Sequence, residues 1–176
     1  MSKLLEENTV YEGIRFKVIR KKYEANNGQL YTREIVHPGD ASLILPIDEN
    51  NNVIWIKQLR EAVDQVQLEL PAGMIDPGET PLECAKRELE EETGLIANNF
   101  ELLTSVYPSI GYTDECLHIF IARDFTQGHQ HFDADEEIIE MVRIPFSECV
   151  EMAKRGEFHH SNMNVAILLY NLKYNS

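Results

Sequence analysis

The first seventy residues contain several short runs that are apolar or alternate between hydrophobic and polar residues, a pattern typical of β-strands. The alternation is clear at 14–18, and it returns over 30–36 after the turn signal Asn26-Asn27-Gly28. Three shorter apolar or alternating runs follow, at 42–47, 53–58 and 66–70. We therefore predict that this part of the chain is β structure that begins with a hairpin.

The spacing of apolar residues changes to a helical period after residue 80. Thr80 and Glu83 match a capping box, with Pro81 in the first turn. An apolar stripe at i, i+3 and i+7 follows, formed by Leu82, Ala85 and Leu89. Gly94 suits the end of such a helix. A well-capped amphipathic helix is predicted between these two signals.

The rest of the chain mixes strands and helices. Strands are predicted at 100–107, 116–122 and 138–144, and helices at 145–155 and 163–173. Polar loops are predicted at 108–115 and 124–135. Mixed strands with a few helices predict an α/β (α+β) fold, in which helices cover a sheet.

Composition narrows the class of protein. A chain of 176 residues, 43% hydrophobic and 26% charged, predicts one domain over residues 1–176. The net charge of −14 argues against nucleic acid or an anionic membrane as main partner. A small phosphorylated substrate stays compatible, because a bound divalent cation reverses the local charge. No run has signal-peptide or membrane-span length, and the three cysteines lack metal-ligand spacing, so we expect a soluble cytoplasmic protein with reduced thiols.

The acidic residues of the predicted helix form an unusual cluster. Glu88, Glu91 and Glu92 are neighbours on a helix, and Arg87 can reach Glu91 at i+4, but Glu88 and Glu92 have no cation four residues away. A solvated charged face is the ordinary interpretation of such a run. The alternative is a site for a hard cation such as Mg²⁺, which prefers oxygen ligands. The preceding loop, Gly73–Glu79, would bring backbone carbonyls to the same place.

These residues also form the pattern G-x5-E-x7-R-E-U-x-E-E-x-G-U, in which U is apolar. The specified positions are Gly73, Glu79, Arg87, Glu88, Leu89, Glu91, Glu92, Gly94 and Leu95. The pattern resembles the signature of the Nudix hydrolases. The resemblance implies a Nudix-type α/β/α sandwich with a mixed central sheet and an N-terminal antiparallel β region. It also implies hydrolysis of a nucleoside diphosphate linked to another group, with Mg²⁺ as cofactor and Mn²⁺ as a substitute.

The same resemblance implies a role for each residue of the cluster. In the family, the acids matching Glu88, Glu91 and Glu92 hold the metal, and the arginine matching Arg87 orients them. This division suits the chemistry, since a diphosphate resists attack until its charge is neutralised and a nucleophilic water is supplied.

Segments around the signature resemble the ADP-ribose and nucleotide-sugar pyrophosphatase branch of the family. They are 32–42, 57–61 and 66–73. By this resemblance, Ala72 gives a backbone carbonyl to the metal, and Arg33, Arg60 and Glu61 contact the substrate. A plain surface position is the alternative for both arginines. The branch also implies a homodimer, formed through about residues 1–40.

The loop 107–115 departs from the branch pattern S-P-G-x-x-x-E. It contains Ser109, Ile110 and Gly111, with Glu115 in its expected place, so Ile110 stands where the marker proline belongs. This weakens ADP-ribose as sole substrate and leaves room for sugar nucleotides such as GDP-mannose. Gly111 and Glu115 are candidate substrate-binding residues. Glu115 could instead bind a second metal ion, or it could be an ordinary acidic residue of the loop with no such role.

The general base of the branch usually comes from an acidic loop well after the signature. The matching segment here is Asp133–Glu140, and we favour Glu137, then Glu136, as the residue that deprotonates the attacking water. With Glu91 and Arg87, these acids make up the candidate catalytic set.

Two histidine pairs and one tryptophan have weaker signals. His129 with His131, and His159 with His160, lack cysteine or acidic partners at regular spacing, so surface histidines are favoured over metal ligands. Trp55 lies in an alternating strand and is predicted to be in the core.

Three functions fit these observations. The first is a metal-dependent pyrophosphatase that splits ADP-ribose or a nucleoside diphosphate sugar into a nucleoside monophosphate and a sugar phosphate. The second is a nucleoside triphosphate or coenzyme A hydrolase with the same signature. The third is a non-catalytic nucleotide-binding module, whose expected mark, loss of the signature acids, is not seen.

Overall fold

The computed structural model describes residues 2–131 and 138–175. The chain forms two compact units, one of Met1–Asp40 with Tyr107–Cys116 and one of Ala41–Val106 with Leu117–Ser176. Among the described residues there are three sheets and three helices, and no helix is long and apolar enough to cross a membrane. The assignment of the whole chain to one domain stays a prediction.

The first unit contains an antiparallel sheet with strand order β1-β2-β3. Its strands are β1 (Lys3–Glu12), β2 (Lys17–Glu24) and β3 (Leu30–His37). The turn between β2 and β3 contains Gly28 at φ +80°, as the turn signal predicted. The predicted strand at 14–18 is wrong, since pairing starts at Lys17. Strand β1 was missed because its mainly polar sequence is exposed throughout and shows no buried face.

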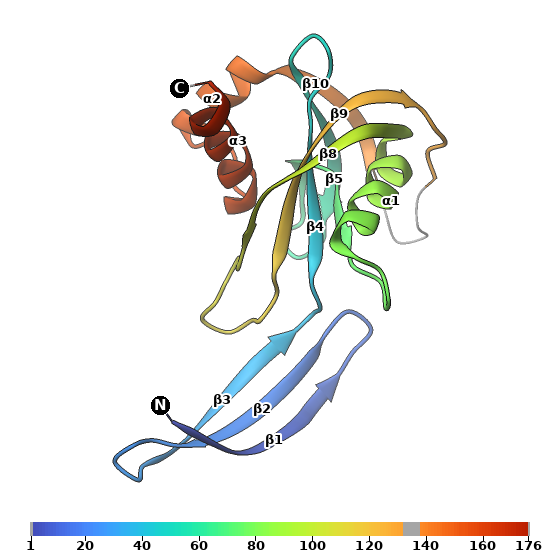
Figure 1. Ribbon diagram of the computed structural model, residues 1–176. Coiled ribbons are helices and arrows are strands. Elements are labelled where there is room, and N and C mark those ends of the chain that lie inside the picture. Colours follow the sequence, from blue (N-terminus) through green and yellow to red (C-terminus); the bar gives the residue numbers. More distant parts are fainter. Residues whose placement is uncertain (1, 132–137, 176) are drawn as a thin grey trace. The chain divides into compact units, whose positions relative to one another are not determined.

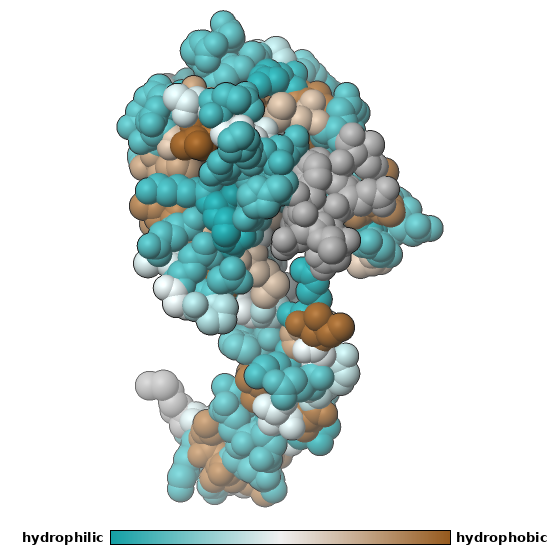
Figure 2. Space-filling model, turned by 90° about the vertical axis from the view of Figure 1, so that its right-hand side faces the viewer, coloured by the Kyte–Doolittle hydropathy of each residue, from teal (hydrophilic) through white to brown (hydrophobic). Residues whose placement is uncertain are grey.

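The register of this sheet gathers apolar side chains on one face. Leu4 pairs with Tyr23, and Tyr23 pairs with Tyr31, whose ring lies 5.3 Å from that of Tyr23. Ile19 pairs with Ile35 on the same face, four residues along β2 from Tyr23, and the charged pair of Lys21 with Arg33 lies between them. Apolar side chains are visible on the surface of this unit (Figure 2).

The second unit contains the other two sheets. Its strands are β4 (Ala41–Pro46), β5 (Asn52–Arg60), β6 (Gln65–Glu69), β7 (Ala72–Met74), β8 (Leu95–Val106), β9 (Leu117–Gln127) and β10 (Ile138–Pro145). Its helices are α1 (Pro81–Thr93), α2 (Phe146–Arg155) and α3 (Ser161–Tyr174). One sheet is mixed, in the order β7-β4-β9-β8 with β4 and β9 parallel, and the other is antiparallel, in the order β10-β5-β6.

The central strand β4 is buried on both faces, which explains its nearly continuous apolar sequence. Leu43 and Leu45 pack into the larger core with α2 and α3, while Ile44 packs against Ala85 and Leu89 of α1. Helix α1 therefore covers one face of the sheet, and α2 and α3 lie on the other (Figure 1). The predicted α/β/α layering is confirmed in this unit.

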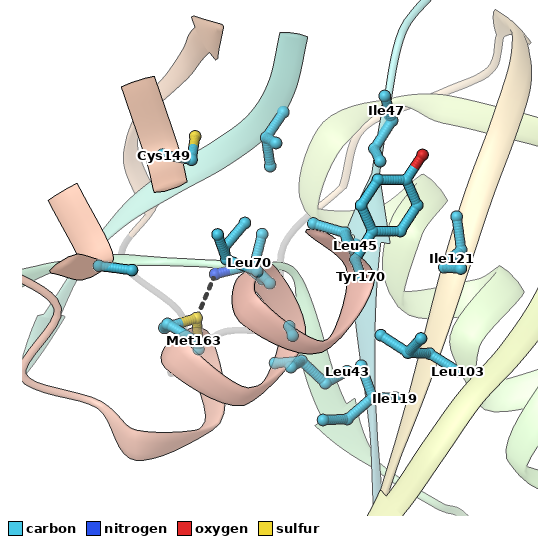
Figure 3. Close-up of a cluster of buried hydrophobic side chains, with 14 of the residues drawn as sticks. Leu43, Leu45, Ile47, Leu70, Leu103, Ile119, Ile121, Cys149, Met163 and Tyr170 are labelled. Carbon is cyan, nitrogen blue, oxygen red and sulfur yellow. Dashed lines mark hydrogen bonds between the residues drawn. The ribbon is translucent and has the colours of Figure 1, made fainter. Parts of the chain in front are cut away.

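The larger core joins strands and helices that are distant in sequence. Figure 3 shows side chains of β4 and β9 facing Met163 and Tyr170 of α3, and the N–H of Leu70 donates to Sδ of Met163 at 3.2 Å. Trp55 is fully buried and its ring lies 4.8 Å from that of Phe158, so its predicted core position is confirmed.

Two strands are longer than predicted. Strands β8 and β9 pair from Leu95 and Gln127 at one end to Val106 and Leu117 at the other. The predicted start at 100 and end at 122 are therefore wrong, as is the loop predicted from 124. Polar residues such as Asn99 and Arg123 face each other in this ribbon, and their pairing was not evident from alternation along either strand.

Candidate active site

Helix α1 begins and ends as its sequence predicts. The hydroxyl of Thr80 accepts a hydrogen bond from the N–H of Glu83 at 3.3 Å, and Oε2 of Glu83 accepts one from the N–H of Thr80 at 2.8 Å. Gly94 ends the helix at φ +69°. Leu82 is 37% exposed, so its predicted place in the buried stripe is wrong, whereas Ala85 and Leu89 are buried against the sheet.

Glu88 and Glu92 lie on the sheet-facing side of α1 and are deeply buried. Their exposed fractions are 6% and 1%, whereas glutamates are rarely buried to this extent. Oε2 of Glu92 accepts a hydrogen bond from the N–H of Ala72 at 3.0 Å. Two carboxylates are thus held one helical turn apart beside strand β7, which identifies this place as the candidate site.

Gly73 makes room for the Glu88 carboxylate. A Cβ atom at residue 73 would lie 1.9 Å from Oε1 and 2.0 Å from Cδ of Glu88. Any side chain at this position would therefore occupy the space of the carboxylate. Glycine is therefore needed at position 73 because the Glu88 carboxylate lies so close to its backbone, and its φ angle is not in the positive range.

Arg87 connects the loop before α1 to the acids of the helix. Its guanidinium binds both oxygens of Glu79, with Nε to Oε1 at 2.9 Å and Nη2 to Oε2 at 3.0 Å. Nη1 donates to Oε1 of Glu88 at 2.6 Å and to Oε2 of Glu91 at 3.0 Å, and Nη2 donates to the carbonyl of Met74 at 3.0 Å. The prediction that Arg87 reaches Glu91 is confirmed, and its bond to Glu88 supplies the cation that helical spacing had not shown.

These contacts change the protonation of the groups involved. The hydrogen bonds from Arg87 hold the pKa of Glu79 below its usual value, and those to Glu79 raise the pKa of Arg87. Both groups are therefore charged across the neutral range. Cys84, under the same loop, has Sγ 3.4 Å from the carbonyl of Met74, and burial raises the pKa of this thiol to about 11.

Glu91 has a second partner that sequence reasoning did not identify. Nε2 of His131 lies 3.1 Å from Oε1 of Glu91, and the N–H of His131 donates to the carbonyl of Glu91 at 3.1 Å. The two residues are forty positions apart, so only the pairing of β8 with β9 brings them together. Within residues 2–131 and 138–175, no group of three or more histidine, cysteine, aspartate or glutamate side chains is arranged to hold a metal ion.

The NUDIX domain family matches residues 37–164 of the chain. The chain belongs to the Nudix family. Enzymes of this family typically depend on divalent metal ions.

Individual relatives are similar in sequence to this chain over most of their length. The chain is 32% identical to the ADP-ribose pyrophosphatase of Bacillus subtilis (strain 168), covering 97% of this chain and 96% of that protein. It is 32% identical to the methanol dehydrogenase activator of Bacillus methanolicus, covering 95% and 94%. It is also 32% identical to the GDP-mannose pyrophosphatase of Cronobacter sakazakii (strain ATCC BAA-894), covering 88% and 84%.

A solved structure has the same fold. The crystal structure of an ADP compounds hydrolase matches with a TM-score of 0.88 and 26% identity, covering 99% of this chain and 94% of that one. The mixed α+β Nudix fold predicted from the sequence is confirmed, and the chain is a Nudix pyrophosphatase.

Arg60, at the end of β5 in this Nudix domain, has a partner that neither interpretation of the sequence included. Its guanidinium binds Glu69 of β6 through two bonds, Nε to Oε1 at 3.0 Å and Nη2 to Oε2 at 2.6 Å. Glu69 is only 2% exposed, and Nε2 of His160 lies 3.6 Å from its Oε1. An acid among the apolar residues of 66–70 was the signal for this pair. Glu61 is exposed in the turn that follows.

The other predicted substrate residues belong to the first unit. The guanidinium of Arg33 lies 4.9 Å from the centre of the Tyr31 ring, and Gly111 is exposed in its loop. Glu115 is half-buried, and burial, followed by the charge of Asp40, raises its pKa. The candidate bases Glu136 and Glu137 lie outside the described residues.

Proposed function

We propose that this Nudix pyrophosphatase hydrolyses the diphosphate bond of ADP-ribose or of a nucleoside diphosphate sugar, with Mg²⁺ as cofactor. The products are a nucleoside monophosphate and a sugar phosphate. The observation that carries the proposal is the pair of buried carboxylates, Glu88 and Glu92, beside the space that Gly73 leaves. Relatives named as ADP-ribose and GDP-mannose pyrophosphatases support this substrate class.

The residues of the site suit a hard divalent cation. Two buried carboxylates one turn apart offer oxygen donors, and an ion between them offsets the cost of their burial. Glu88, Glu91 and Glu92, with the carbonyl of Ala72, would hold Mg²⁺, or Mn²⁺ in its place. When bound, the cation supplies positive charge for the diphosphate and lowers the pKa of water at the site.

The remaining residues position these groups and bind the substrate. Arg87 orients Glu88 and Glu91 through the bonds that tie all three to the loop carrying Glu79. Removal of a proton from water falls to an acid of the segment Asp133–Glu140, with Glu137 preferred to Glu136. The proposed substrate contacts are Arg33, Arg60, Glu61, Gly111 and Glu115.

The proposal also includes an oligomeric state and a cellular location. The apolar face of β1, β2 and β3, with Tyr23 stacked on Tyr31, suits a second copy of the chain, so we propose a homodimer. With three free cysteines, the protein is suited to the cytoplasm.

A substrate panel with Mg²⁺, Mn²⁺ and a chelator tests the function. ADP-ribose and GDP-mannose are expected to release AMP and GMP only when a divalent cation is present. Glu92→Gln is expected to lower kcat by about a thousandfold, because the amide removes a charge from the site but still accepts the bond from Ala72. Liquid chromatography of the nucleotides gives the rates.

Glu90→Gln is the matched control, since Glu90 lies on the same helical turn outside the signature and a glutamine keeps the side-chain oxygen that accepts the N–H of His129; it is expected to keep full turnover. Dominant activity on nucleoside triphosphates or coenzyme A would reject the proposed substrate class. Tight binding of ADP-ribose without release of AMP would instead support a binding module.

A further inference from the structure

The end of helix α1 is covered by residues 128–131, which follow β9 directly. Three carbonyls at this end accept hydrogen bonds from the segment: Gly94 from the N–H of Gly128 at 2.8 Å, Glu92 from Nε2 of Gln130 at 2.7 Å, and Glu91 from the N–H of His131 at 3.1 Å. A helix leaves its final carbonyls without partners of its own. The segment therefore supplies the C-terminal hydrogen bonds of the helix that carries the signature acids.

The packing of this segment against α1 is close and leaves little freedom of position. A Cβ atom at Gly128 would lie 2.7 Å from Oε1 of Glu90 and 2.8 Å from Cγ1 of Ile96. The next N–H, of His129, donates to the same Glu90 oxygen at 3.3 Å. The backbone at 128–131 is thus held in one register against the helix, which fixes where the side chain of His131 begins.

The imidazole of His131 completes the set of donors around Glu91. Nη1 of Arg87 lies 3.0 Å from one carboxylate oxygen, and Nε2 of His131 lies 3.1 Å from the other. Each oxygen thus has its own donor, one from the helix and one from the segment after β9. A long glutamate side chain held at both oxygens loses rotamer freedom before any ligand arrives.

We propose that His131 is a positioning residue for Glu91, holding that carboxylate in place for the divalent cation. The inference rests on the proposed function, in which Glu91 is one of the cation ligands. Partners of metal ligands orient the ligand, and their loss typically lowers metal affinity or activity by about 10–100-fold. The proposed effect of His131 is therefore on cation affinity and on turnover.

Metal affinity and turnover of His131→Ala test the proposal together. The dissociation constant for Mn²⁺, followed by the loss of free Mn²⁺ signal in electron paramagnetic resonance, is expected to rise about tenfold. At a fixed Mg²⁺ concentration kcat is expected to fall about tenfold while KM for ADP-ribose stays unchanged. His131→Gln, whose amide keeps an N–H donor, is expected to restore most of both losses.

His129→Ala is the matched control, because this neighbouring histidine bonds to the helix through its backbone N–H. It is expected to match the wild type in Mn²⁺ affinity and in kcat. In a Glu91→Gln background, His131→Ala is expected to have no further effect on Mn²⁺ affinity, since the two residues act as one unit.

Several results would overturn the inference. They are unchanged Mn²⁺ affinity in His131→Ala, equal losses in His129→Ala, or fully additive effects with Glu91→Gln. Each of these results counts against the inference only when the wild-type protein itself binds Mn²⁺ and hydrolyses ADP-ribose. Failure of the proposed function is different, because the wild type itself would then show no cation-dependent turnover, and His131 would have no cation ligand to position.

Discussion

At the scale of single residues, the site depends on one missing side chain. Glu88 can lie between α1 and β7 only because Gly73 has no Cβ, which would be 1.9 Å from its Oε1. The two residues are fifteen positions apart in the sequence, yet the Glu88 carboxylate occupies the space that a side chain at position 73 would fill. A buried carboxylate without room must move toward solvent or distort the backbone, and either change removes it from Glu92.

Gly73→Ala is therefore expected to abolish most turnover and to destabilise the fold by about 1–3 kcal/mol, the usual cost of overpacking. Initial rates with Mg²⁺ and urea unfolding measure the two effects. The stability loss is expected to disappear in a Glu88→Ala background, because the added methyl group then has space. Equal destabilisation in both backgrounds would show that residue 73 does not compete with Glu88 for space.

At the scale of elements, one ion pair ties the loop 73–79 to helix α1. Arg87 binds both oxygens of Glu79, and the side chain of Glu79 is only 14% exposed. Because this carboxylate is shielded from solvent, the pair stabilises the fold more than an exposed pair such as Lys17 with Glu12, whose side chains are mostly in solvent. The helix and the loop that carries Gly73 are held as one piece.

Stability is expected to depend on pH through Glu79. Because Arg87 lowers the folded-state pKa of Glu79, the pair stabilises the protein above the unfolded-state pKa of about 4.3, and this contribution is lost as pH falls below it. Urea unfolding at pH 6 and at lower pH measures the effect. The stability difference between wild type and Glu79→Gln is expected to shrink on acidification; a constant difference would contradict the assignment.

At the scale of the whole molecule, the first unit has little core of its own. Its sheet has three strands, and residues of β1 are exposed along its length, including Leu4 at 47% and Tyr11 at 54%. Three strands need a hydrophobic face packed against something to be stable. A second copy of this chain provides such a face in the proposed homodimer.

Tyr23→Glu is expected to convert the dimer into a monomer, because it puts a charge between Leu4 and Tyr31 on this face. Light scattering after size-exclusion chromatography gives the mass. Lys22→Glu, the neighbouring position on the opposite face, is the matched control and is expected to remain dimeric. A monomeric wild type, or dimers of both variants, would refute this face as the interface.

The sequence by itself determined what depends on neighbours along the chain. Thr80, Glu83 and Gly94 predicted both ends of α1, since capping is a local interaction. The runs at 53–58 and 66–70 predicted β5 and β6, although burial does not alternate along either strand: Val53, Ile54, Trp55 and Ile56 of β5 are all buried. The family was evident for the same reason, as its signature lies within one loop and one helix.

Only the tertiary structure decided how deep and how well partnered those residues are. Spacing along the chain showed Glu88 and Glu92 only as neighbours on one helix, but the packing of α1 on β4 buried them almost completely. The pairs of Glu69 with Arg60 and of Glu91 with His131 join separate elements, and no spacing along the chain encodes them. Contacts between elements arise from how sheets and helices stack, so the chemistry was predictable from the sequence while its supports were not.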